Sequence, residues 1–395
     1  MAPLMSPLIS HLLPRNPEFD SSNTAGVLRA QWTNPSDTFS VLLLLGGDVI
    51  GRALAQLTGS GLAPVTFSFG WVAYSVSALL SAMGENKLMP PNPDCRCKVM
   101  NGKNGYTRDN SSWILGRIVR DYEFWMDAKI TEKTDQVLDK KMEELGLAKR
   151  PLIAGLVVSI YKPDETRPPK RVDKDMIYWS GIASMAWQLG IAVIPLGLYG
   201  DWGVFIITAA GTWLAMATGL LPQWKREKWA SRERSKEPYI LTRGNGSQHA
   251  VVILGTRHGL NLEDLASGQA NVTVNATSFT CIALLMLSVL WILLLITATG
   301  LTEHKWYLLA VGLLGIFQNT FAASAARQPR NFGIPLQFVE VFGETKVMQA
   351  LYAVERKYPG IGRSMRHEFF SNELQPEEYK EWRRFKKISA ESNGP

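Results

Sequence analysis

The sequence predicts a multi-pass α-helical membrane protein, with six transmembrane helices in three hairpins and a small α+β cytoplasmic lobe built from the connectors and the C-terminal tail. Hydrophobic residues, including 13 Trp, make up 46% of the 395 residues and gather in long apolar runs. A run of about 20 apolar residues suffices for a helix to cross a bilayer. The connectors between the runs carry Asn-Gly turns and β-branched segments, which indicate strands.

The predicted hairpins alternate with charged segments. In chain order we expect an N-terminal tail (1–37), hairpin one (38–83), a connector (84–175), hairpin two (176–221), a connector (222–277), hairpin three (278–326) and a C-terminal region (327–395). Basic residues flank the connector ends of the spans, which places the connectors and both termini in the cytoplasm, with the endoplasmic reticulum as the expected membrane. This orientation leaves four glycosylation sequons unmodified, at Asn110, Asn245, Asn271 and Asn275.

The lobe is expected to combine strands with amphipathic helices. The segment 239–254 predicts two strands joined by a turn, because Arg243-Gly-Asn-Gly separates two apolar stretches. Further strands are predicted within 96–106, 152–161 and 336–342. Helices are predicted within 113–147, 345–358 and 376–385.

The charge of the chain points to lipid as a partner. The net charge is +7, and the basic excess lies close to the span ends, where it meets anionic headgroups. No nucleic-acid recognition module is present, so we expect no nucleic-acid partner. The three cysteines give no disulfide framework, and Cys95 and Cys97 lack a second ligand pair, so no metal is expected. Nucleotide-binding and zinc-protease motifs are absent, so no cofactor is expected.

The first candidate site is Asp48 with Arg52, in the middle of the predicted first span. Charged groups at that depth are costly, by about 2.5–3.5 kcal/mol each, and are kept where they pair or face a polar cavity. Their i, i+4 spacing allows pairing. Asp48 is therefore expected to act as a general acid or base oriented by Arg52. The alternative is a structural pair that locks the span into the bundle, with Arg52 reaching the interface.

The second candidate site follows the predicted hairpin strands. Arg257, His258, Glu263 and Asp264 bring a cation, a base and two acids within ten residues. Loops supported by strands often carry catalytic groups. The alternative is a turn followed by a helix, in which Glu263 and Asp264 stabilise the first turn.

Other polar residues favour structural roles. Asp109, Asn110 and the following serines are helix-capping types, while the neighbouring Arg108 can reach a lipid phosphate. Gln188, Gln318 and Asn319 lie within predicted spans, where hydrogen bonding between helices is their ordinary role. Gly211, Ala215 and Gly219 form a strip of small residues that predicts close packing of the fourth span.

Several segments resemble a fungal family of multi-pass membrane proteins. They are Gln31-Trp-Thr-Asn-Pro-Ser-Asp, Leu42-Leu-Leu-Leu-Gly-Gly-Asp, Phe67-Ser-Phe-Gly-Trp-Val-Ala-Tyr and Arg108-Asp-Asn-Ser-Ser-Trp. Similar proteins occur in polyketide gene clusters, including those for aurovertin- and citreoviridin-type polyene pyrones, where a membrane hydrolase opens epoxides. The resemblance implies a tailoring hydrolase acting on a lipophilic polyketide epoxide, and it carries over no site residue.

Two other classes of function remain open. A transporter or channel for small molecules is favoured by charges within a span, although no inverted repeat is visible. A non-catalytic scaffold would hold soluble pathway enzymes at the membrane through the lobe. Product formation from a lipophilic small-molecule substrate distinguishes the enzyme from both.

Overall fold

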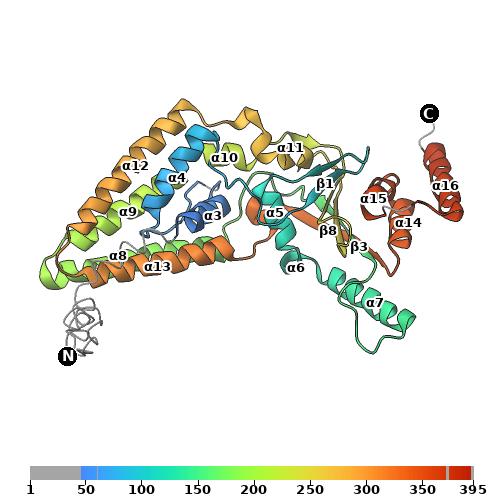
Figure 1. The fold of residues 1–395 in the computed structure, drawn as a ribbon, viewed down its shortest axis with the longest axis horizontal. Helices are drawn as coiled ribbons and strands as arrows, with labels where there is room; N and C mark the ends of the chain where they lie inside the picture. Colours follow the sequence, from blue (N-terminus) through green and yellow to red (C-terminus); the bar gives the residue numbers. More distant parts are fainter. Residues whose placement is uncertain (1–45, 60, 371–372, 393–395) are drawn as a thin grey trace, which may run out of the picture.

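A computed structural model describes residues 46–59, 61–370 and 373–392. Figure 1 shows a bundle of long helices at one end of the molecule and a sheet covered by shorter helices at the other. The predicted N-terminal tail (1–37) and the start of the first predicted span (38–45) lie outside the described residues.

The prediction of six transmembrane helices is wrong. Among the described residues, three helices are long and apolar enough to cross a membrane: α8 (Met176–Tyr199), α12 (Ser278–Thr299) and α13 (Lys305–Ser324). A fourth is present if α9 (Gly203–Gly219) and α10 (Pro222–Lys228), which meet at a bend of 41°, form one broken span. Together with a six-stranded mixed sheet, this makes an α/β fold instead of a six-span protein.

The first predicted hairpin is where the prediction fails. Residues 46–84 form two short helices, α3 (Gly47–Leu57) and α4 (Trp71–Gly84), with an extended segment between them. Gly59 and Gly61 have φ angles of 110° and 97°, which end the helix without steric cost. The apolar residues of the extended segment are buried in protein, and a hydropathy pattern does not distinguish this burial from contact with lipid.

The extended segment, residues 62–70, fills the centre of the helix bundle. Asn319 of α13 binds both backbone groups of Thr66, through Oδ1 at 3.0 Å and Nδ2 at 2.9 Å. Gln188 of α8 donates to the Phe67 carbonyl at 2.7 Å. These side chains replace the hydrogen bonds that a helix would supply, which is how irregular backbone is accommodated among apolar helices.

Small residues make room for this segment. A Cβ added at Gly315 would lie 1.8 Å from the Phe67 carbonyl oxygen, and one added at Gly211 would lie 2.3 Å from the Phe67 ring. At Gly219 the added atom would lie 2.9 Å from the Ala63 methyl group. The strip of small residues predicted in the fourth span is therefore confirmed as a close-packing surface, although it packs on an extended chain.

The lobe contains a six-stranded mixed sheet in the order β2-β1-β5-β6-β3-β8. Only β3 and β6 pair in parallel. The strands are β1 (Lys98–Asn101), β2 (Thr107–Asp109), β3 (Leu156–Pro163), β5 (Tyr239–Thr242), β6 (His249–Ile253) and β8 (Leu336–Glu344), and a separate pair joins β4 (Glu233–Ser235) to β7 (Gly259–Leu260). The predicted strand, turn and strand within 239–254 is confirmed as antiparallel β5 and β6.

Alternation along the strands divides the sheet into two faces. Val157 and Val251 face the core that continues into the bundle, whereas Val158 and Val252 face a second core. The first face is covered by α5 (Trp113–Arg120), α6 (Tyr122–Trp125), α7 (Ala128–Leu145) and α11 (Leu262–Ala266), and the second by α14 (Val347–Lys357), α15 (Ile361–Phe369) and α16 (Pro376–Ser392). Short 3-10 turns cover Gly268–Ala270, Val272–Val274 and Pro329–Phe332.

Candidate functional site

The predicted Asp48–Arg52 pair forms, but it is not enclosed by the bundle. Arg52 Nε lies 3.0 Å from Asp48 Oδ2. The Asp48 side chain is 79% exposed and that of Arg52 is 47% exposed, so the expectation of a buried carboxylate is wrong. The reason is that α3 begins at Gly47, which places Asp48 in the first turn of a short helix, where a carboxylate is favourable.

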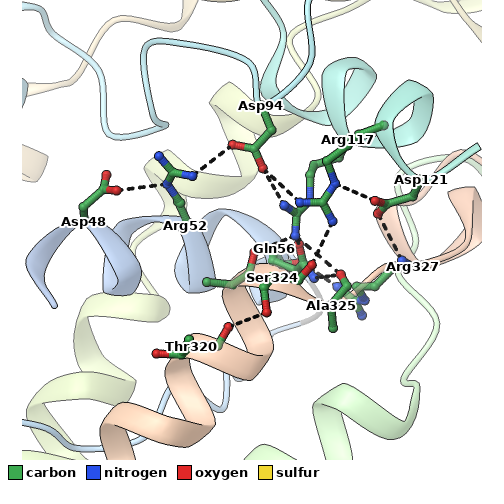
Figure 2. Close-up of polar contacts among 12 residues, drawn as sticks. Asp48, Arg52, Gln56, Asp94, Arg117, Asp121, Thr320, Ser324, Ala325 and Arg327 are labelled. Carbon is green, nitrogen blue, oxygen red and sulfur yellow. Dashed lines mark hydrogen bonds and ion pairs between the residues drawn. The ribbon is translucent and has the colours of Figure 1, made fainter.

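Arg52 leads into a network of buried charges between the bundle and the lobe. Its Nη1 lies 3.5 Å from Asp94 Oδ1, and Asp94 also pairs with Arg117 of α5 (Figure 2). The Arg117 side chain is 1% exposed. Its Nη2 donates to the Ala323 carbonyl at 2.6 Å and to the Gln56 amide oxygen. Arg117 therefore ties the lobe to the C-terminal end of α13.

Two further buried cations meet the C-terminal end of α3. Lys228 Nζ donates to the carbonyl oxygens of Ala55, Gln56 and Thr58 at 2.9, 3.2 and 2.7 Å. Arg327 donates to the Gln56 carbonyl at 2.7 Å and contacts both oxygens of Asp175, at 2.6 and 3.0 Å. Carbonyl groups at a helix C-terminus lack intrahelical donors and carry partial negative charge. We interpret Arg117, Lys228 and Arg327 as structural residues, and we call the place where they join the lobe to α3 and α13 the junction.

Arg117, Lys228 and Arg327 were not singled out from the sequence. The sequence did indicate that Arg117 is buried, because it lies inside the apolar stretch Trp113-Ile-Leu-Gly-Arg-Ile-Val. The residues on both sides of Arg117 in α5 are buried as well. Lys228 and Arg327 follow predicted spans and were interpreted as orientation signals. Their burial depends on carbonyl groups from α3, far away in the sequence.

The four residues of the second predicted site have different partners and do not form one site. Asp264 pairs with Arg232, with Nε 2.6 Å from Oδ2, and the Glu263 carboxylate accepts from Asn101 Nδ2 at 3.4 Å. The Asn261 side chain caps α11, with Glu263 and Asp264 in its first turn, so the capping alternative is confirmed. His258 lines a small cavity of about 20 Å³, and Arg257 occupies a turn with φ 65°.

An apolar groove with convergent polar groups lies on the bundle-facing side of the sheet. It encloses about 420 Å³ between α5–α6, the β5–β6 turn and the loop before β3. Its apolar residues are Ile118, Val119, Trp125, Leu152, Ile153, Leu241 and Val251, and its polar residues include Tyr122, Glu123, Arg243, Gln248 and His249. Leu152 and Ile153 are 95% and 61% exposed, so the groove has an apolar entrance.

Two consecutive residues leave buried polar atoms without a hydrogen-bond partner in this groove. They are Gln248 Nε2 and His249 Nδ1, and the statement holds within the described ranges. Tyr122 is different, because its hydroxyl donates to Ser159 Oγ at 2.7 Å while its ring lies 5.3 Å from that of His249. Buried polar groups are normally paired, so an unpaired amide donor and an unpaired ring nitrogen in the lining of one groove indicate a place for a ligand.

Burial sets the protonation state of His249. Loss of water around the ring lowers the pKa of His249 below its usual value; Glu123 acts in the opposite direction and Arg243 in the same direction. Near neutral pH the imidazole is therefore uncharged, and an uncharged ring nitrogen accepts a proton. Burial also raises the pKa of Tyr122, so that its hydroxyl stays a hydrogen-bond donor at neutral pH.

The described part of the chain contains no group of three or more His, Cys, Asp and Glu side chains arranged to hold a metal ion. Cys95, Cys97 and Cys281 are free thiols. Comparison of the chain with protein-family models, with curated proteins and with solved structures gave no match. The resemblance to the fungal membrane family therefore stays a prediction.

Proposed function

We propose that this chain is a membrane-anchored enzyme that opens the epoxide of a lipophilic small molecule in the groove of the lobe. The observation that carries the proposal is the unpaired Gln248 Nε2 and His249 Nδ1 among the residues that line an apolar groove of about 420 Å³. A ligand with an apolar body and one oxygen atom matches that combination. A polyketide epoxide, the substrate that the family resemblance implies, is such a ligand.

The groove supplies the groups that hydrolytic opening needs. The Gln248 amide is a donor to the epoxide oxygen, and uncharged His249 accepts a proton from water as the water oxygen bonds to a ring carbon. The ring C–O bond breaks in the same step as the new C–O bond forms, and the resulting alkoxide takes the proton back from the imidazolium, so the net reaction is epoxide plus water to diol. An internal hydroxyl in place of water gives a cyclic ether.

Membrane anchoring is supported by the outer surface of the bundle. Large apolar side chains on its helices are exposed, among them Trp179 and Trp187 on α8, Trp213 on α9, and Ile282 and Leu285 on α12. An exposed apolar surface of this kind is matched to lipid. The extended segment 62–70 fills the centre of the bundle, which favours an anchor over a passage and weakens the transporter alternative.

The test is turnover by microsomes that contain the full chain. A lipophilic polyene epoxide is supplied, and diol or cyclic ether is measured by mass spectrometry. Replacing His249 with Gln is expected to lower the rate by about 10²–10⁴-fold, which is typical for loss of a general base. His367→Gln is the matched control, because His367 is exposed on α15, which covers the opposite face of the sheet.

The same assay separates this groove from the site predicted at Asp48. If the Asp48→Asn variant loses turnover while His249→Gln keeps it, the groove is not the reaction centre. If neither the wild type nor any variant forms product, the enzyme proposal fails as a whole.

A non-catalytic binding role is the second candidate. The observation that favours it is that, within the part of the chain that the structure describes, His249 Nδ1 has no hydrogen-bond partner, whereas catalytic histidines are usually oriented by a hydrogen bond. Trp125 lines the groove and is one of 13 Trp, so binding is measured as the tryptophan quenching that disappears in a Trp125→Phe variant. Saturable quenching without product would support a carrier or scaffold.

A further inference from the structure

A second depression, of about 580 Å³, lies at the lobe end of the helix bundle. Its wall comes from α10 and the residues after it, from the turn Val272–Val274 that precedes α12, and from Arg108 of β2. Because α9 leads directly into α10 and α12 begins at Ser278, both parts of the wall lie where candidate spans enter the lobe. This is the level at which lipid headgroups are found.

The charges that line the depression are mainly positive. Arg108, Arg226 and Arg232 face one carboxylate, that of Asp264. Arg232 holds both oxygens of that carboxylate, at 2.6 and 2.9 Å, so the two charges offset each other. Among the residues that the structure describes, Arg108 and Arg226 have no carboxylate within ion-pair distance. Two guanidinium groups therefore have no ion-pair partner, although Arg108 also acts on the Asp264 carboxylate at longer range and helps to lower the pKa of Asp264.

A buried lysine outside the depression binds one segment of its wall. The Lys87 side chain is buried, and its Nζ donates to the Asn271 carbonyl at 2.7 Å and to Asn275 Oδ1 at 2.8 Å. The Asn271 side chain in turn accepts from the Thr273 backbone at 3.0 Å. These hydrogen bonds hold the segment that carries Asn271 and Thr273, and Trp229 and Val274 are apolar parts of the lining.

We infer that this depression binds the phosphate of an anionic lipid headgroup, with Arg108 and Arg226 as its ligands. A phosphomonoester carries about two negative charges at neutral pH. One guanidinium group can donate two parallel hydrogen bonds to two oxygens of the same phosphate. Two uncompensated arginines match that charge. The apolar wall and the place beside the span ends fit a lipid better than a free anion.

The inference rests on the membrane placement of the bundle but not on catalysis in the groove. The full chain is purified in a neutral detergent, and native mass spectrometry measures its binding of phosphatidic acid and of phosphatidylcholine. Phosphatidic acid is expected to bind more tightly, and Arg108→Gln and Arg226→Gln are each expected to weaken it about tenfold. Lys225→Gln is the matched control, because Lys225 is an exposed neighbour on α10 that does not line the depression.

Each alternative gives a different result. Equal binding of both lipids, or an equal loss in Lys225→Gln, would overturn the inference in favour of diffuse charge attraction. Glycerol 3-phosphate that competes with phosphatidic acid at equal concentration would identify a soluble phosphate as the ligand and overturn the lipid assignment. A glycosidase-sensitive mobility shift that disappears in Asn271→Gln would place a glycan in the wall and exclude the site. Turnover in the groove is measured in parallel, so failure of one proposal leaves the other testable.

Discussion

The centre of the helix bundle is filled by the chain itself, whereas one face of the sheet in the lobe is partly open. In the bundle, the chain itself occupies the centre, with Thr66 held by Asn319 and the Phe67 carbonyl 1.8 Å from the place where a Cβ of Gly315 would lie. In the lobe, the sheet face under α5 and α6 is left open as a groove of about 420 Å³. The filled region is suited to anchoring and the open region to binding, so apolar content alone does not locate the functional site.

Replacing Arg117 with Met is expected to have the largest effect on stability. Arg117 is a buried cation of the junction between the filled helix bundle and the lobe with the open groove. The change leaves Asp94 buried and without its closest cation, which costs about 3–5 kcal/mol for a buried pair. Equilibrium unfolding in mixed micelles measures it, with Arg52→Met as the exposed control. Equal losses in the two variants would mean that burial at the junction is unimportant.

Replacing Gly315 with Ala tests whether the bundle centre is filled. The new methyl group collides with the Phe67 carbonyl, and overpacking of this kind costs about 1–3 kcal/mol. Gly190→Ala on α8 is the control, because an added Cβ there has no atom within 4 Å. The control should be neutral or slightly stabilising. A Gly315→Ala protein as stable as the control would show that the centre has spare room.

Acid sensitivity tests whether the groove histidine is uncharged. Burial lowers the pKa of His249 in the folded state, whereas the unfolded pKa is about 6.5. The unfolded chain therefore takes up the proton first, so the stabilising contribution is present above about pH 6.5 and is lost as the pH falls toward the folded pKa. His249→Gln should lose less unfolding free energy than wild type between pH 7.5 and 5, a range that spans the reference value of about 6.5. An identical loss in both proteins would contradict the assignment.

Replacing Asp48 with Asn is expected to have the smallest effect. The carboxylate is exposed and its pair with Arg52 is solvent-screened, so the change in unfolding free energy is about 0.5 kcal/mol or less. Thermal unfolding in detergent with and without added salt measures it. A loss comparable with that of Arg117→Met would mean that Asp48 is enclosed in the membrane after all.

Local patterns predicted much of the lobe. Alternation and turn residues located β5, β6 and β8. The capping predicted at Asp109, Asn110 and the following serines is wrong, because Ser112 precedes α5 without a side-chain hydrogen bond to that helix. The apolar helices α8, α12 and α13 were also predicted, as was the ion pair between Asp48 and Arg52. These features depend on neighbours within about one or two turns of chain, which a sequence displays directly.

Long-range partners could not be predicted in the same way. The sites predicted from the sequence were charged residues within an apolar run or close together in one loop. The groove instead combines Tyr122, Arg243 and His249 with a loop before β3. Gln248 and His249 carry no motif, and their unpaired atoms become visible only when the sheet and α6 are in place.

By itself, the sequence determined which segments are apolar and where the chain turns. Only the tertiary structure decided that residues 62–70 lie in the centre of the bundle, and that Arg117, Lys228 and Arg327 are buried while Asp48 is exposed. The physical reason is that hydropathy measures withdrawal from water and is the same for burial in lipid or in protein. Whether a charge is buried depends on carbonyls and carboxylates brought from distant parts of the chain.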